Sequence, residues 1–74
     1  MQVISEKTHE TADICGFTYI HDDEVGQAFQ CGRYLIQVGR ATYACSFKGQ
    51  TFSWGHESIL EAIESCEKHS LRKY

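Results

Sequence analysis

Three short turns in the middle of the chain, each containing a glycine, constrain its fold more than any other feature. They are Gly32-Arg33, Gly39-Arg40 and Lys48-Gly49, and extended alternating segments separate them. A two-residue hairpin loop pairs the residues on either side of it, and strand side chains alternate between two faces. The spacing therefore predicts a meander of four antiparallel strands over residues 28–54.

Turn chemistry and spacing together set the expected register. Glycine in the first loop position favours a type II′ turn at Gly32 and Gly39, because only glycine adopts the required positive φ cheaply. Lys48 suits a type I′ turn less well, and a three-residue loop is the alternative there. The predicted cross-strand pairs are Cys31–Tyr34, Phe29–Ile36, Val38–Ala41, Ile36–Tyr43, Tyr34–Cys45, Cys45–Phe52 and Tyr43–Trp54.

This register sorts the side chains into an apolar face and a mostly polar face, which is typical of an antiparallel sheet covered on one side. The expected inner face is Phe29, Cys31, Tyr34, Ile36, Val38, Ala41, Tyr43, Cys45, Phe47, Phe52 and Trp54. The expected outer face is Ala28, Gln30, Arg33, Leu35, Gln37, Arg40, Thr42, Ala44, Ser46, Thr51 and Ser53.

A C-terminal helix is the expected cover. It should start near Ser53 or Gly55 and run to about Leu71, with one apolar stripe at helical spacing. Acidic residues precede basic ones along it, which complements the helix dipole. The stripe is Ile59, Ala62, Ile63, Cys66 and Ser70, with Leu60 at its edge.

The first third of the chain gives weaker signals. Gln2–Ile4 reads as a short strand and Thr8–Asp13 as a helical turn capped by Thr8. Ile14–Ile20 is rich in β-branched and aromatic residues and favours a fifth strand, which stays open. We expect a single α+β domain over residues 1–74: an antiparallel β-meander of four or five strands packed on one C-terminal α-helix.

Composition narrows the classes of function. The formal net charge is −3, and no basic stripe of the kind that binds a phosphate backbone is evident. No apolar run approaches the ~20 residues of a membrane span, and the first residues lack a secretory pattern. We therefore expect a cytoplasmic chain that does not enter a membrane and for which direct nucleic-acid binding is disfavoured.

The four cysteines do not suggest a metal site or a disulfide framework. They lie far apart in sequence at positions 15, 31, 45 and 66, without a C-x-x-C pair. Cys31 and Cys45 are both expected opposite Tyr34 on its two flanking strands, near 10 Å apart and too far to bridge. We interpret Cys31, Cys45 and Cys66 as small buried hydrophobic residues. No cofactor and no catalytic constellation is predicted, so we expect a protein that is not an enzyme.

The function that remains is protein binding. We expect a small regulator or inhibitor of a larger complex, one concrete form being a phage-encoded inhibitor of a host defence or nucleic-acid-processing machine. The acidic loop Asp22, Asp23 and Glu24 could compete for the basic residues of such a partner, and Leu35 with Arg40 marks a contact patch on the outer face. Pairing through a sheet edge could serve the partner or a homodimer.

Two alternatives stay open. One is a nucleic-acid-binding regulator that uses Arg33, Arg40, Lys48 and the basic residues of the tail His69–Tyr74. The other is a small enzyme or metal protein that uses Cys15 and His21.

Overall fold

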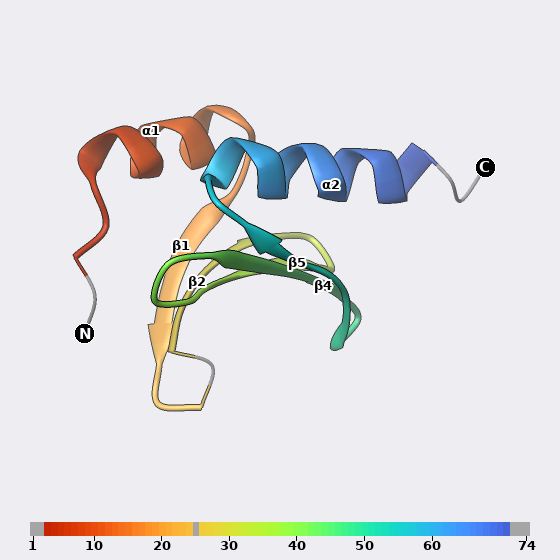
Figure 1. The fold of residues 1–74 in the computed structure, drawn as a ribbon, viewed down its shortest axis with the longest axis horizontal. Helices are drawn as coiled ribbons and strands as arrows, with labels where there is room; N and C mark the ends of the chain where they lie inside the picture. The colour runs from red at the N-terminus through yellow and green to blue at the C-terminus, as the bar shows by residue number, and fades with distance from the viewer. Residues whose placement is uncertain (1–2, 25, 72–74) are drawn as a thin grey trace.

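The computed structural model describes residues 3–24 and 26–71, and it confirms the α+β architecture. A five-stranded antiparallel sheet runs in the order β1-β2-β3-β4-β5. Both helices lie on the same side of this sheet (Figure 1). The elements are α1 (Glu6–Ile14), β1 (Thr18–Asp22), β2 (Gly26–Cys31), β3 (Tyr34–Val38), β4 (Tyr43–Phe47), β5 (Gln50–His56) and α2 (Ile59–Leu71).

The N-terminal segment folds differently from the expectation. Ser5, and not Thr8, caps α1, and its hydroxyl accepts the backbone N–H of Thr8 at 3.2 Å. The predicted strand at residues 2–4 is wrong for Val3 and Ile4, which have no strand structure, while Gln2 lies outside the described residues. Half-buried Ile4 packs against the core instead.

Helix α1 ends in a Schellman arrangement that the sequence analysis did not identify. The amide of Phe17 donates to the carbonyl of Ala12 at 2.8 Å, and that of Gly16 donates to Asp13 at 3.0 Å. Gly16 adopts φ +85°, which a residue with a Cβ rarely tolerates. The fifth strand is confirmed but starts only after this cap, at Thr18, and includes His21 and Asp22.

The second hairpin of the meander has a longer loop than predicted. Residues 39–42 connect β3 to β4, and the Gly39 amide donates to the Thr42 carbonyl at 2.8 Å. Gly39 is not among the residues with positive φ, so the predicted type II′ turn there is wrong. The pairs become Val38–Tyr43, Ile36–Cys45 and Tyr34–Phe47. Two extra residues shift the register by two, which leaves each side chain on its predicted face.

The first and third turns have the predicted length. Gly32 takes φ +60°, and the pairs Cys31–Tyr34 and Phe29–Ile36 form as expected. At the third turn Lys48 and Gly49 take φ 53° and 83°, which are the signs of a type I′ turn. Because of the longer β3–β4 loop, Cys45 lies opposite Ile36, and the expectation that it faces Tyr34 is wrong.

Strand β5 is irregular beyond that turn. Phe47 pairs with Gln50 and Ser46 with Thr51, but Cys45 then pairs with Ser53 and Tyr43 with His56. The register slips at both steps, so the predicted pairs Cys45–Phe52 and Tyr43–Trp54 are wrong. Each slip inserts a residue into β5 and interrupts the alternation of its side chains.

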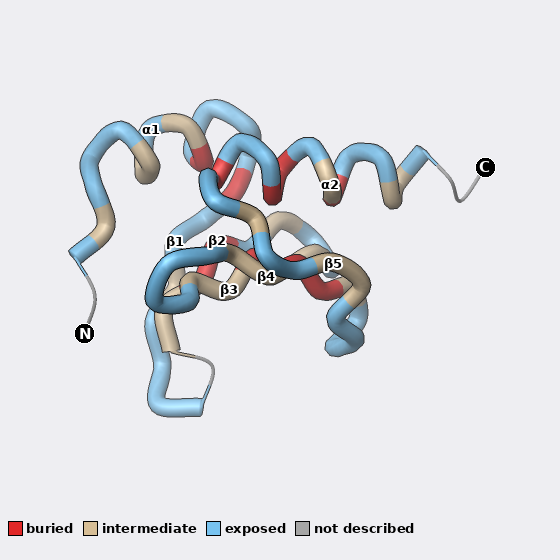
Figure 2. The backbone as a smooth tube through the Cα atoms, viewed as in Figure 1, coloured by how far each residue is buried: buried red, intermediate tan, exposed pale blue. Residues whose placement is uncertain are grey.

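The core lies between the sheet and the two helices. Figure 2 shows buried segments where α2 faces the strands. Helix α2 starts at Ile59 and not near Ser53 or Gly55, because β5 extends to His56 and Ser58 caps the helix through the Glu61 amide at 3.3 Å. The buried apolar residues are Ala12, Phe17, Phe29, Ile36, Cys45, Ile59, Ala62, Ile63 and Cys66, and half-buried Cys31, Tyr34, Val38, Tyr43 and Phe52 pack against them.

The face of the sheet away from the helices differs from the predicted polar surface. Ala28 and Ser46 are buried there although neither helix covers them, because their small side chains lie between larger neighbours on the adjoining strands. The hydroxyl of Ser46 donates to the Leu35 carbonyl at 3.4 Å. Half-buried Leu35 and Ala44 remain as the apolar part of this face.

Candidate binding surfaces at the sheet edges

The meander leaves β1 and β5 at its two edges. Within residues 3–24 and 26–71, each of them pairs with one neighbouring strand. Strand β1 covers the edge of β2 near Phe29, and β5, which contains Phe52, stays at the other edge. An edge strand presents backbone donors and acceptors on which an added strand can pair.

Strand β5 combines an open edge with an exposed tryptophan. Trp54 is 72% exposed, so its predicted place on the inner face is wrong. The physical reason is the first register slip, between Thr51 and Ser53, which adds one residue to β5 and so moves Trp54 to the opposite face of the sheet. The seven residues of β5 include no Lys, Arg, Asp or Glu. Charged side chains are a common device against edge pairing, and β5 lacks it.

A depression of about 360 Å³ lies between β5 and α2. The ring of His69 stacks on Phe52 at 4.2 Å between centroids, and its Nδ1 lies 2.9 Å from the Tyr34 hydroxyl. These contacts hold the end of α2 against the sheet and form one wall of the depression. Ser53, Ser65 and Lys68 complete the lining.

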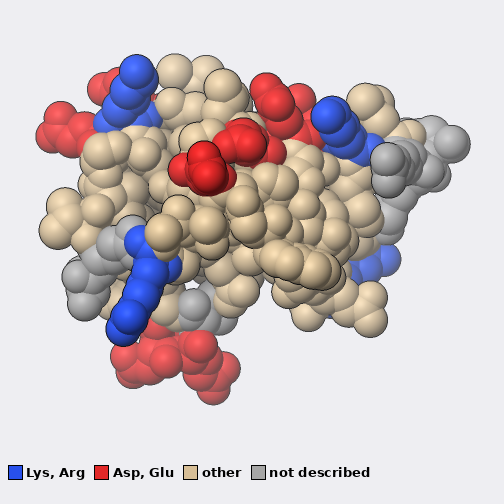
Figure 3. Space-filling view, viewed as in Figure 1, with Lys and Arg blue, Asp and Glu red and all other residues tan. Residues whose placement is uncertain are grey.

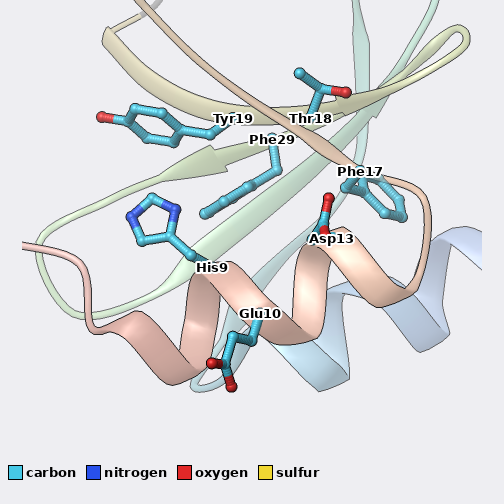
Figure 4. Close-up of a pocket in the computed structure, with 7 residues that line it drawn as sticks. All are labelled: His9, Glu10, Asp13, Phe17, Thr18, Tyr19 and Phe29. Carbon is cyan, nitrogen blue, oxygen red and sulfur yellow. The ribbon is translucent and has the colours of Figure 1, made fainter.

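The other edge also has a helix beside it. A second depression of about 360 Å³ lies between α1 and β1. Figure 4 shows His9 reaching from α1 toward Tyr19 and Phe29, with ring centroids at 4.9 and 5.5 Å. Glu10 points away from these rings in the same view. The rings of His9, Phe17, Tyr19 and Phe29 form most of the lining, and Glu10, Asp13 and Thr18 complete it.

The predicted acidic residues lie at the far end of β1 from this depression. Asp22 ends the strand, and its Oδ1 accepts the Glu24 amide at 2.9 Å across the turn. Asp22, Asp23 and Glu24 are all exposed. In Figure 3 acidic side chains gather at the lower end of the molecule, where the β1–β2 connection lies in Figure 1.

The other predicted partner-binding residues are spread over the sheet. Arg40 is exposed in the β3–β4 loop, at the same end of the sheet as the β1–β2 connection. Leu35 lies within β3 between Gln30 and Ser46. Four of the five predicted residues therefore lie at one end of the sheet, and Leu35 lies toward the other end.

The basic residues divide between the two ends of the sheet. The Lys48 amide donates to the Arg33 carbonyl at 3.1 Å, so the first and third turns are adjacent. His69, near the end of α2, packs on Phe47 at 5.3 Å between ring centroids, which brings the end of that helix to the same place. Arg40 lies at the opposite end, and Arg72 and Lys73 of the tail lie outside the described residues.

The residues of the enzyme alternative are not brought together. Cys15 caps α1 before β1 begins, and His21 lies near the other end of that strand, so the length of β1 separates them. Among the residues that the structure describes, no three His, Cys, Asp or Glu side chains are arranged to hold a metal ion. Neither helix in the described part of the chain has the length and apolar character needed to cross a membrane.

Comparison of the chain with protein-family models, with curated proteins and with solved structures found no match. The two edges of the sheet and the depressions beside them are therefore the features that bear on function. The exposure of Trp54 was not predicted, because the two register slips break the alternation of side chains along β5. The run from Gln50 to His56 without a Lys, Arg, Asp or Glu was the available signal for an edge strand that lacks charged side chains.

Proposed function

We propose that this chain is a non-enzymatic protein-binding module that regulates or inhibits a larger complex, and that it binds an extended segment of its partner along β5. The observation that carries the proposal is the exposed Trp54 on an edge strand without Lys, Arg, Asp or Glu. Tryptophan is enriched among the residues that dominate binding energy at protein interfaces. Strand addition uses the backbone groups of the edge for affinity and neighbouring pockets for specificity.

The depression beside β5 supports this mode of binding. Phe52 and His69 form its floor and wall, so a side chain of an added strand would meet aromatic surface there. Lys68 lies at the same depression and favours an acidic or polar residue in the partner near α2. A nucleic-acid-processing enzyme or a defence complex remains a concrete class of partner for this proposal.

Replacement of Trp54 tests the proposed interface. Trp54→Lys and Leu71→Ala variants, alongside the wild type, should be used as affinity baits in a host extract, with mass spectrometry of the captured proteins. Leu71 is the matched control because it is 73% exposed and lies on α2. We expect a partner that the wild type and Leu71→Ala capture and that Trp54→Lys loses, with its affinity reduced by about 30-fold or more.

The same variants have a stability control. Because most of the Trp54 side chain is exposed, the Trp54→Lys replacement should change the free energy of unfolding by only about 0.5 kcal/mol. Equal capture by the wild type and Trp54→Lys would overturn the proposed role of β5. Light scattering shows whether the occupant of β5 is a second copy of the chain, in which case the wild type is dimeric and Trp54→Lys monomeric.

The acidic β1–β2 connection supplies a second prediction. Replacement of Asp22, Asp23 and Glu24 by lysine should weaken a complex with a basic partner and flatten its salt dependence. The matched control replaces the three by Asn, Asn and Gln, which keeps an acceptor for the Glu24 amide while removing the charges. If the lysine variant and the wild type bound with the same affinity and the same salt dependence, the three acidic residues would not contribute to binding.

A nucleic-acid-binding regulator is the second candidate. The adjacency of the first and third turns favours it, because Arg33 and Lys48 then lie at one end of the molecule together with the end of α2. Arg40 at the opposite end of the sheet does not contribute to such a surface. A gel-shift assay at low salt is the experiment, and the absence of any shift excludes this candidate.

A further inference from the structure

Two thiols from distant parts of the chain meet in the core. Cys45 comes from the middle of β4 and Cys66 from the middle of α2, and they are 0% and 3% exposed. Both belong to the same buried cluster. The proposed protein-binding surface makes no use of either thiol.

Hydrogen bonding places the two sulfurs next to each other. The Cys45 thiol donates to the Ala62 carbonyl oxygen at 3.2 Å. In an α-helix that same carbonyl accepts the amide of the residue four positions later, which here is Cys66. Helical side chains lean toward the N-terminus of their helix, so the Cys66 side chain leans over the turn that contains Ala62. Cys45 and Cys66 therefore approach the same carbonyl from the sheet and from the helix.

The hydrogen bond between the two thiols shifts their pKa values in opposite directions. A hydrogen bond from Cys66 lowers the pKa of Cys45, and burial opposes that effect. The pKa of the Cys66 thiol is raised, first by its hydrogen bond to Cys45 and then by burial.

We propose that Cys45 and Cys66 form a reversible disulfide that ties α2 to the centre of the sheet when the chain meets a low-molecular-weight disulfide such as oxidised glutathione. The thiolate of one of the two cysteines attacks a glutathione sulfur, forms a mixed disulfide and releases one glutathione thiolate. The thiolate of the other cysteine then attacks the protein sulfur of that mixed disulfide and releases the second glutathione thiolate. Two protein thiols are oxidised, one glutathione disulfide is reduced to two thiols, and the two protein protons pass to the leaving thiolates.

The remaining cysteines are poorly placed to bridge Cys45. Cys15 is exposed beyond the end of α1, and Cys31 is half-buried on β2, two strands away from β4. The raised pKa of Cys66 has the hydrogen bond to Cys45 as its largest cause, followed by burial and by the charges of Cys45 and Cys31, so Cys31–Cys66 is the competing pair that the peptide map has to exclude. Because both sulfurs of the proposed pair are shielded, exchange proceeds from states in which α2 has opened locally. The bridge would then close those states and hold the helix in place.

Refolding the full chain in glutathione buffers of graded redox ratio tests the proposal. Bridged protein is lighter by two hydrogens, and peptide mapping after alkylation of free thiols identifies the linked pair. We expect a single intramolecular bridge, Cys45–Cys66, whose equilibrium constant against glutathione is at least about tenfold higher in native buffer than in denaturing guanidinium. The bridged form should also unfold at a higher temperature than the reduced form.

Serine variants distinguish a Cys45–Cys66 bridge from bridges that involve Cys15 or Cys31. Cys31→Ser, in a Cys15→Ser background that prevents intermolecular exchange, should keep the bridge, and Cys66→Ser should abolish it. A bridge that maps to Cys31, or equal equilibrium constants in native buffer and in guanidinium, would overturn the proposal. The wild-type measurement decides even where a serine variant does not fold.

Discussion

Replacement of Phe29 by alanine should leave the protein largely unfolded at 25 °C. Phe29 is 1% exposed, pairs with Ile36 in the centre of the sheet and contacts the rings of His9 and Tyr19. Truncation of a buried phenylalanine costs about 3–5 kcal/mol. A single core in a domain of this size rarely supplies more than about 3–5 kcal/mol in total. The cost is therefore comparable with the whole free energy of unfolding.

Far-UV circular dichroism during urea unfolding measures this effect. Leu60→Ala is the control, since Leu60 is 51% exposed on α2 and its truncation should cost well under the Phe29 value. A cooperative transition for Phe29→Ala near the wild-type midpoint would show that Phe29 does not anchor the contact between α1 and the sheet.

The second large effect is expected for Gly39→Ala. A Cβ at this position would lie 2.8 Å from the Thr42 carbonyl oxygen, which is the atom that accepts the Gly39 amide and closes the loop. The loop has to shift or lose this hydrogen bond. We expect a loss of about 1–3 kcal/mol in the free energy of unfolding.

Two further variants show whether the clash with Thr42 causes the loss of stability in Gly39→Ala. Ala41→Ser changes an exposed residue of the same loop and should leave stability within about 0.5 kcal/mol of the wild type. Gly32→Ala meets open space but carries φ +60°, so it tests backbone strain without a clash. If denaturant unfolding gave wild-type stability for Gly39→Ala, the close approach of Gly39 and Thr42 would be wrong.

Most of the sheet could be predicted from the sequence because a register error of two residues leaves each side chain on the same face. The β3–β4 loop is two residues longer than expected, yet Tyr43 and Cys45 keep their predicted face. The slips in β5 each add one residue, and the prediction for Trp54 failed there. No residue in that stretch is obligatory for a bulge, although Gly55 at φ +78° offered a hint.

Other differences had sequence signals that a stricter analysis would have found. Ser58 and Glu61 have the spacing of a capping box, and they set the start of α2 five residues or so after the predicted one. Gly16 after a short helical segment is the usual mark of a helix end. The candidate surfaces were less predictable, because the exposure of Trp54 and the contact of α1 with β1 depend on packing between distant segments.

The order of the strands also bears on how the chain reaches this fold. Every strand pairs only with its neighbours in sequence, so the sheet can grow hairpin by hairpin through the closure of short loops. Only the packing of α1 against α2 joins segments from opposite ends of the described chain. Contact between these two helices closes a much longer loop than any hairpin of the sheet does, so the entropic cost of that closure is larger than that of any single turn.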